Sequence, residues 1–338
     1  MKINLVFALL PLLAIIISAC KKEDNPNNPT GSDPKVYVAG YWGGDSYLWV
    51  DGIPTKLSEG GLGSVPFDVK VSGNDVYVCG REANYAVYWK NGKRVRLNDG
   101  SKFSQALKLF ISDTDIYVIG HQEVESLESS PKLWINGKDV PVNIPGEGSF
   151  TDVYVSGKDV YILGWYYNDQ ANTIPFLWKN SVIQDLTDGS ISTMPTAIFV
   201  KANDIYIAGY EKNGYQRGIP VFWKNGVKSY LENSGNRSQV SSIFVSGTDL
   251  YIGGYKLDSI TNHYVPVYWK NGDLHLMGHS DQINSLYRSF FLYNNEMYAT
   301  GPGEVTGEPN KTTYSRNNEF IMLADTNIIT SGEAIYVK

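Results

Sequence analysis

Residues 242–276 read SIFVSGTDLYIGGYKLDSITNHYVPVYWKNGDLHL, and much of this pattern recurs along the chain. Its fixed part is an apolar-Tyr-apolar run that ends in glycine, followed in three copies by Trp-Lys-Asn-Gly and in three others by a variant of it. A period of roughly 40–50 residues predicts a repeat architecture. The repeated tyrosines are Tyr37, Tyr77, Tyr117, Tyr161, Tyr206, Tyr251 and Tyr298, and the glycines are Gly40, Gly80, Gly120, Gly164, Gly209, Gly254 and Gly301.

Each copy is expected to form four short β-strands. In the quoted copy these are Ser242 to Val245, Leu250 to Gly253, Val267 to Trp269 and Leu274 to Met277. The apolar runs are short and rich in β-branched and aromatic residues, which favours strands over helices. The Asn271-Gly272 dipeptide predicts a type I′ hairpin, because both central residues of that turn need a positive φ.

Four-stranded units repeated around an axis are the blades of a β-propeller. The first repeat opens at Val36 directly with its second strand, and so lacks its first strand. The last repeat is followed by Glu333–Lys338, which matches the first strand Thr196–Lys201. We therefore expect an all-β, seven-bladed propeller over 35–338, in which the C-terminal strand completes the first blade and removes an open sheet edge.

Residues 1–19 read as a signal peptide. Lys2 provides the positive charge, and the apolar run that follows is too short to span a membrane. Ile17-Ser18-Ala19-Cys20 resembles a bacterial lipobox, which implies a lipidated Cys20. The alternative is an ordinary signal peptide cleaved before a free cysteine.

Residues 20–34 then form a lipidated cysteine and a polar tether, which cannot bury apolar area. Cys20-Lys21-Lys22-Glu23-Asp24 resembles the export signal of surface lipoproteins in the Bacteroidota. The resemblance implies an outer-membrane lipoprotein exposed at the cell surface and held in the membrane by its lipid alone. The alternative is a solvated charged linker.

The blades also resemble the extracellular repeats named for a His-Ala-Phe triplet. The nearest copy is Phe176-Leu-Trp-Lys-Asn180 with Asp185-Leu186, where Ser181 stands in place of the usual glycine. The histidine of the triplet is absent from every copy. The resemblance covers about half of each blade and implies no activity.

Composition excludes several classes of partner. A formal net charge of −6 argues against nucleic acid as a partner, because nucleic-acid binding needs clustered positive charge.

Cys79 lies in an apolar run and is expected to be a small buried hydrophobe. The histidines show no metal-ligand spacing, so we expect no metal and no cofactor. We expect a monomer. The four histidines are His121, His263, His275 and His279.

Connections between strands one and two and between strands three and four are tight turns, expected on one face of the disc. The other connections are longer and variable, and form the opposite, long-loop face, where function usually lies. The tether enters at a second strand and therefore leaves from the tight-turn face. Aromatic and polar residues that interrupt the repeat beside these loops are the candidate ligand-binding residues: Trp42, Trp165, Tyr166, Tyr215, Arg217 and His263.

These features favour a non-catalytic binding module for a glycan or a protein. A polysaccharide hydrolase or lyase is the first alternative, with carboxylates that meet in the central funnel. A structural partner in an envelope complex is the second. The acidic residues considered for the enzyme are Glu82, Glu123, Asp169, Glu211 and Asp258.

Overall fold

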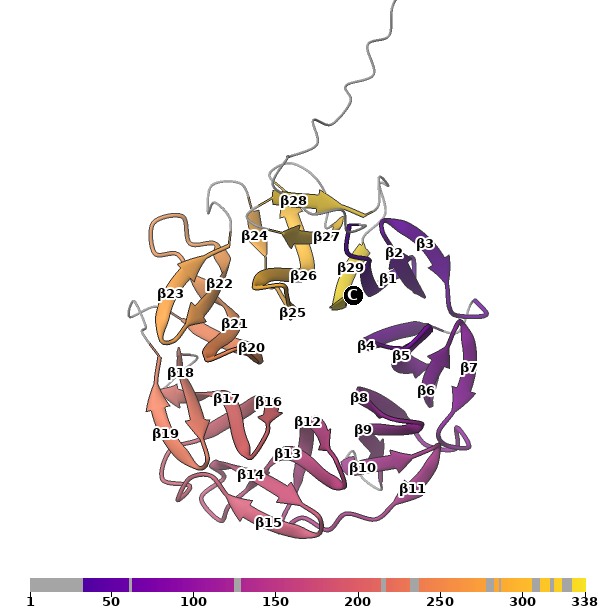
Figure 1. The fold of residues 1–338 in the computed structure, drawn as a ribbon. Helices are drawn as coiled ribbons and strands as arrows, with labels where there is room; N and C mark the ends of the chain where they lie inside the picture. The colour runs from indigo at the N-terminus through magenta and orange to yellow at the C-terminus, as the bar shows by residue number, and fades with distance from the viewer. Residues whose placement is uncertain are drawn as a thin grey trace, which may run out of the picture. The chain divides into compact units, whose positions relative to one another are not determined.

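Every repeat folds into an antiparallel sheet, and seven sheets stand around a central axis (Figure 1). The computed structural model describes residues 33–338 apart from 61–62, 125–128, 214–216, 232–236, 278–282, 286, 306–310, 317–318 and 324–329. Residues 34–338 make one compact unit. The predicted signal peptide, Cys20 and the tether up to residue 32 lie outside the described residues.

We name the blades A to G and give their strands from the axis outward. The seventh blade has a divided inner strand, β24 and β25, both of which pair with β26. The strands are: blade A, β29 (Thr330–Val337), β1 (Val36–Trp42), β2 (Asp45–Val50), β3 (Ile53–Lys56); blade B, β4 (Ser64–Ser72), β5 (Asp75–Glu82), β6 (Tyr85–Lys90), β7 (Lys93–Arg96); blade C, β8 (Ser104–Ser112), β9 (Asp115–Glu123), β10 (Ser129–Ile135), β11 (Lys138–Val140); blade D, β12 (Gly148–Ser156), β13 (Asp159–Tyr167), β14 (Thr173–Lys179), β15 (Val182–Asp185); blade E, β16 (Thr193–Lys201), β17 (Asp204–Asn213), β18 (Arg217–Lys224), β19 (Val227–Tyr230); blade F, β20 (Ser238–Ser246), β21 (Asp249–Leu257), β22 (Tyr264–Lys270), β23 (Asp273–Leu276); blade G, β24 (Ile283–Ser285), β25 (Ser289–Tyr293), β26 (Glu296–Val305), β27 (Lys311–Arg316), β28 (Glu319–Met322).

The two ends of this unit share blade A, as predicted. Strand β29 runs antiparallel to β1, with Tyr336 opposite Tyr37 and Val337 opposite Val36. Backbone hydrogen bonds between Lys35 and Lys338 extend the pair at 2.8 and 3.0 Å. The C-terminal strand therefore completes the first blade and closes the ring.

The Asn-Gly turns have the expected geometry. Asn271 and Gly272 have φ values of 53° and 97°, both positive, as a type I′ turn requires. In blade D the second position is Ser181, which is held at φ 76° although it carries a Cβ. A left-handed backbone at a residue other than glycine is strained.

In blades B to F the second strand begins with an aspartate that ties two hairpin turns together. In blade D, Asn180 Nδ2 donates to Asp159 Oδ1 at 2.7 Å, and Lys179 Nζ lies 2.8 Å from Asp159 Oδ2. The Lys179 ammonium also lies 5.0 Å from the centroid of the Tyr161 ring. The hydrogen bond from Lys179, and then that from Asn180, lowers the pKa of Asp159. The carboxylate of Asp159 thus binds the side chains of the neighbouring turn.

This contact set, which we call the turn clamp, recurs around the ring. Blades B, E and F repeat all of its members, and blade C keeps the Asp115–Asn136 pair. In blade G, Glu296 and Arg316 take the places of Asp and Lys. The repeated Tyr, Lys and Asn are thus scaffold residues. The complete clamps are Asp75–Tyr77–Lys90–Asn91, Asp159–Tyr161–Lys179–Asn180, Asp204–Tyr206–Lys224–Asn225 and Asp249–Tyr251–Lys270–Asn271.

The repeated glycines lie against a bulge in the inner strand. A Cβ on Gly80 would come within 2.2 Å of the Val65 carbonyl oxygen, far inside van der Waals contact. The register of β4 on β5 shifts between Pro66 and Asp68, beside this glycine. Only glycine fits at this close approach, because the clash is with backbone.

The core lies between the blades. The repeated tryptophans Trp49, Trp89, Trp134, Trp223 and Trp269 are fully buried there. Cys79 is buried too, as predicted, and burial raises the pKa of its thiol well above the ordinary value. Among the described residues, no helix is long and apolar enough to cross a membrane.

Loop lengths on the long-loop face differ from the expectation. The loops from strand four to the next blade have one length in blades A to E: 57–63, 97–103, 141–147, 186–192 and 231–237. In blades A and B the loop between strands two and three is as short as the tight turns, Gly43-Gly44 and Ala83-Asn84. Variation is therefore concentrated in the strand two to strand three loops of the other blades.

Replacement of Ser181 by glycine is expected to stabilise the protein by about 1 kcal/mol, because glycine adopts a positive φ without steric cost. The reciprocal change Gly137→Ser, at the equivalent turn of blade C where φ is 78°, should cost a similar amount. Urea midpoints of the two variants measure both effects. A Ser181→Gly variant no more stable than the original chain would contradict this account of the turn.

Candidate functional site

Two of the predicted ligand-binding residues serve the packing between blades. Trp42 contacts Tyr47 with ring centroids 5.2 Å apart, in a cluster that includes Tyr298 of blade G. Tyr166 packs on Phe176 and donates its hydroxyl to Asp185 Oδ2 at 3.0 Å. Burial, followed by this hydrogen bond, raises the pKa of Tyr166 to about 12. Both residues, each half-buried, thus contribute to the packing of the fold.

Trp165 has a different environment. It lies on β13, and its nearest aromatic partner is Tyr167 of the same strand, edge-on at 5.0 Å and 69°. Trp165 is half-buried and Tyr167 is 41% exposed. This aromatic pair stands at the long-loop end of blade D, at the start of the loop 168–172.

The remaining candidates are on blades E and F. Tyr215 lies outside the described residues, and the backbone of Arg217 begins β18. His263 is half-buried in the loop between β21 and β22, where its carbonyl accepts the amide of Asp258 at 2.8 Å. Because Trp42, Trp165 and His263 belong to blades A, D and F, the structure does not gather them into one site.

The acidic residues considered for catalysis are directed away from the axis where their partners are known. Glu82 is buried and paired with Arg94 of the outer strand β7. Glu211 pairs with Lys228 of β19 at 2.5 Å and accepts the Tyr230 hydroxyl at 3.1 Å. Asp258 accepts the Thr261 hydroxyl of its own loop at 2.8 Å. None of these three lines the cavity on the propeller axis.

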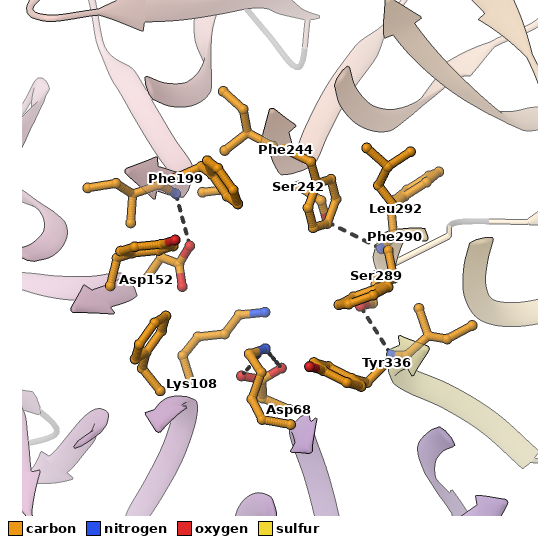
Figure 2. Close-up of a pocket in the computed structure, with 18 of the residues that line it drawn as sticks. Asp68, Lys108, Asp152, Phe199, Ser242, Phe244, Ser289, Phe290, Leu292 and Tyr336 are labelled. Carbon is orange, nitrogen blue, oxygen red and sulfur yellow. Dashed lines mark hydrogen bonds and ion pairs between the residues drawn. The ribbon is translucent and has the colours of Figure 1, made fainter. Parts of the chain in front are cut away.

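The axis instead holds a cavity of about 500 Å³ between the inner strands (Figure 2). Its lining includes Ser72, Ser246 and Asn295 beside the tight turns, so it opens on the tight-turn face. The leading prediction from sequence placed function on the opposite face, and only the enzyme alternative invoked a central funnel.

One layer of the cavity wall is aromatic. The inner-strand residue opposite each repeated tyrosine points to the axis, and it is Lys70 in blade B and an aromatic residue in every other blade. Around the channel the aromatic residues are, in order, Phe110, Tyr154, Phe199, Phe244, Phe291 and Tyr336. The ring centroids of each consecutive pair in this series lie 4.7, 5.5, 6.4, 5.8 and 4.5 Å apart.

The next layer, deeper in the channel, contains charge. Asp68, Lys108 and Asp152 occupy equivalent positions of blades B, C and D, and they are grouped on one side of the channel (Figure 2). Lys70 Nζ donates to both oxygens of Asp68 at 2.8 and 2.9 Å. Burial lowers the pKa of Lys70, but the charge of Asp68 and these bonds outweigh it, so the pKa is raised.

Both aspartates join successive blades. Asp68 Oδ2 accepts the backbone amide of Leu109 at 3.1 Å, and Asp152 Oδ2 accepts that of Ile198 at 2.9 Å. The other oxygen of Asp152 accepts the amide of Val153 at 2.9 Å. Burial raises the pKa of Asp152, opposed by the positive charge of Lys108.

Serines take over this role in later blades. Ser242 Oγ accepts the amide of Phe290, and Ser289 Oγ that of Ile335, each at 3.2 Å. A hydrogen-bond acceptor at this position therefore ties its blade to the next one. The carboxylates found in the funnel are structural acceptors in this arrangement.

A signal for this layer was present in the sequence. In several inner strands a charged residue stands next to an apolar one, as in Asp68-Val69-Lys70 and Asp152-Val153-Tyr154. Charges in the middle of a strand near an axis point into a channel, because alternate side chains share one face. Among the described residues, no group of three or more His, Cys, Asp or Glu side chains could hold a metal ion.

No protein-family model matches the chain, and no curated protein matches it. Several solved structures match the chain. A Pyrococcus horikoshii acylaminoacyl peptidase matches with a TM-score of 0.57 and 11% identity over 88% of this chain and 52% of that one. A puromycin-hydrolyzing peptidase of Mycobacterium tuberculosis matches with a TM-score of 0.56 and 8% identity, over 85% and 53%. The chain thus spans about half the length of these two peptidases.

The propeller domain of the Trilobed protease from Pyrococcus furiosus matches over nearly its full length. The TM-score is 0.54 with 8% identity, over 88% of this chain and 96% of that domain. That domain is described as having an open velcro topology, whereas β29 closes the ring here. At these identities the likeness establishes the β-propeller fold and nothing further.

Substitution of Asp152 tests the link between blades D and E. Asp152→Ala leaves the amide of Ile198 without its acceptor, which should cost about 1–3 kcal/mol. Asp152→Ser removes the same charge but restores a hydroxyl acceptor, as Ser242 provides in blade F. The serine variant should be about 1 kcal/mol more stable than the alanine variant in urea unfolding. Equal stability of the two variants would show that the acceptor does not join the blades.

Proposed function

We propose that this chain is a non-catalytic binding propeller that takes a glycan, or a protein, on its long-loop face. The observation that carries the proposal is the Trp165–Tyr167 pair, whose rings flank a loop and are not part of an inter-blade cluster among the described residues. Amphipathic aromatic rings beside polar groups suit both sugar faces and protein hot spots.

The chemistry of the acidic residues supports binding over catalysis. A glycoside hydrolase of the usual type needs two carboxyl groups that face one substrate, one as acid and one as base or nucleophile. Asp68 and Asp152 accept backbone amides, and Glu82 and Glu211 pair with outer-strand cations. These carboxylates are already engaged in holding the blades.

The proposal includes the location of the protein. Ile17-Ser18-Ala19-Cys20 supports a lipid anchor on Cys20, and the charged residues that follow support export to the outer leaflet of the outer membrane. A binding propeller on a polar tether would then meet its ligand outside the cell.

A glycan array probed with the purified chain tests the function. We expect one class of glycan to bind, and Trp165→Ala to weaken that binding by about tenfold or more, as loss of a hot-spot ring does. Tyr230→Ala is the matched control, because Tyr230 is an exposed ring on the outer strand β19. If no glycan binds, the glycan form of the proposal fails, and capture of a protein partner by the chain tests the protein form.

A different result would contradict the location of the binding site but not the binding function. If a glycan binds and Trp165→Ala leaves its affinity unchanged, the ligand lies away from the Trp165–Tyr167 pair. Circular dichroism of both variants confirms that each ring was removed from a folded protein.

A further inference from the structure

Lys108 is the one charged side chain of the described channel layer without a direct polar contact, although its positive charge acts on the carboxylate of Asp152. Asp68 is bound by Lys70 and the Leu109 amide, and both oxygens of Asp152 accept amides. Within the part of the chain that the structure describes, Lys108 makes no hydrogen bond or ion pair. Figure 2 shows its side chain extended into the cavity, toward the middle of the channel.

The fold does not require a lysine here. Ala197, Ser242, Ser289 and Ala334 stand at the equivalent positions of blades E, F, G and A. Small residues therefore satisfy the packing of the ring at this level. Partial burial of an ammonium costs free energy of desolvation, and the packing at this level does not call for it.

The walls around the Lys108 ammonium determine what it can bind. The aromatic layer lies between Lys108 and the tight-turn face, so a ligand that enters there passes the rings first. The rings favour an apolar and flat body. The volume of about 500 Å³ suits a small molecule, since such pockets range over roughly 300–1,000 Å³.

The charges nearby limit the ligand to one negative charge. The cavity lining holds two carboxylates, Asp68 and Asp152, and two ammonium groups, Lys70 and Lys108, so these side chains carry no net charge together. A monoanion on Lys108 then leaves the site with a single net negative charge. The carboxylates of Asp68 and Asp152 lie in the same layer and would repel a second negative charge on the ligand. A phosphate monoester or a dicarboxylate is disfavoured for this reason.

We propose that the channel binds a small monocarboxylate with an aromatic or similarly apolar body, with its carboxylate on Lys108 Nζ and its body between the rings of the aromatic layer. This site is separate from the long-loop face, and neither proposal depends on the other.

Calorimetric titration with 2-naphthoate and 2-naphthamide tests the site. The two probes share one ring system and differ in charge. We expect 2-naphthoate to bind with one molecule per chain. Lys108→Ala should weaken that binding by about tenfold or more, because hydrogen bonds to charged groups are the strong ones. The amide should bind more weakly than the carboxylate, and equally to both proteins.

Lys158→Ala is the matched control, because Lys158 is an exposed lysine of a tight turn on the same face. It removes the same charge and should leave both affinities unchanged. Thermal unfolding verifies that Lys108→Ala is folded, as expected from the alanines at equivalent positions in blades A and E.

Three results would overturn the proposal. They are absence of 2-naphthoate binding at millimolar concentration, equal 2-naphthoate affinity of the original chain and Lys108→Ala, and equal affinity of the original chain for the carboxylate and the amide.

Discussion

The turn clamp between an aspartate and the Asn-containing turn of the next hairpin is the interaction on which blades B, D, E and F depend, and blade C keeps one of its pairs. In blade D, the Asn180 side chain donates to Asp159 and accepts the amide of Val160 at 3.0 Å. One amide group thus joins the hairpin of strands one and two to that of strands three and four. The side chain has this reach because its own backbone is held at a positive φ, which asparagine tolerates better than most residues. The asparagine of the repeated Lys-Asn pair therefore supplies hydrogen bonds that hold these sheets together.

A second polar interaction joins one blade to the next. The inner-strand residue at the level of Asp68 accepts an amide of the following inner strand in blades B, D, F and G. Two of these acceptors are carboxylates in a funnel where an enzyme of this shape would place its catalytic acids. Both carboxylates are hydrogen-bonded to backbone amides of the next blade, whereas Lys108 makes no hydrogen bond among the described residues.

The architecture could be predicted from the sequence because each repeat corresponds to one blade. The number of blades, the positive φ of the Asn-Gly turns and the completion of blade A by Glu333–Lys338 are confirmed. Strand bounds were too short: the strand predicted over Ser242 to Val245 is Ser238–Ser246. Pairing continues past the apolar residues, because backbone hydrogen bonds do not depend on side-chain polarity.

The residues of the candidate sites were harder to predict from the sequence, because their role depends on the direction in which each side chain points. Trp42 and Trp165 both interrupt the repeat beside a loop, yet one packs between blades and the other pairs with the exposed Tyr167. Glu82 and Glu211 were counted as funnel carboxylates, but their partners are on outer strands. The bulge beside each repeated glycine shifts the inner-strand register, and it is not visible in a pattern of apolar and polar residues.

The central claim is that the repeated residues build the scaffold, whereas residues that depart from the repeat inside the channel bind a ligand. A crystal structure of the chain soaked with 6-bromo-2-naphthoate tests it most directly, because the anomalous signal of bromine locates the ligand independently of any variant. The account predicts a bromine peak on the tight-turn side of the channel, among the aromatic rings, with the carboxylate about 2.8 Å from Lys108 Nζ. A channel without the ligand, in a crystal where bromine peaks appear only elsewhere on the protein, would contradict it.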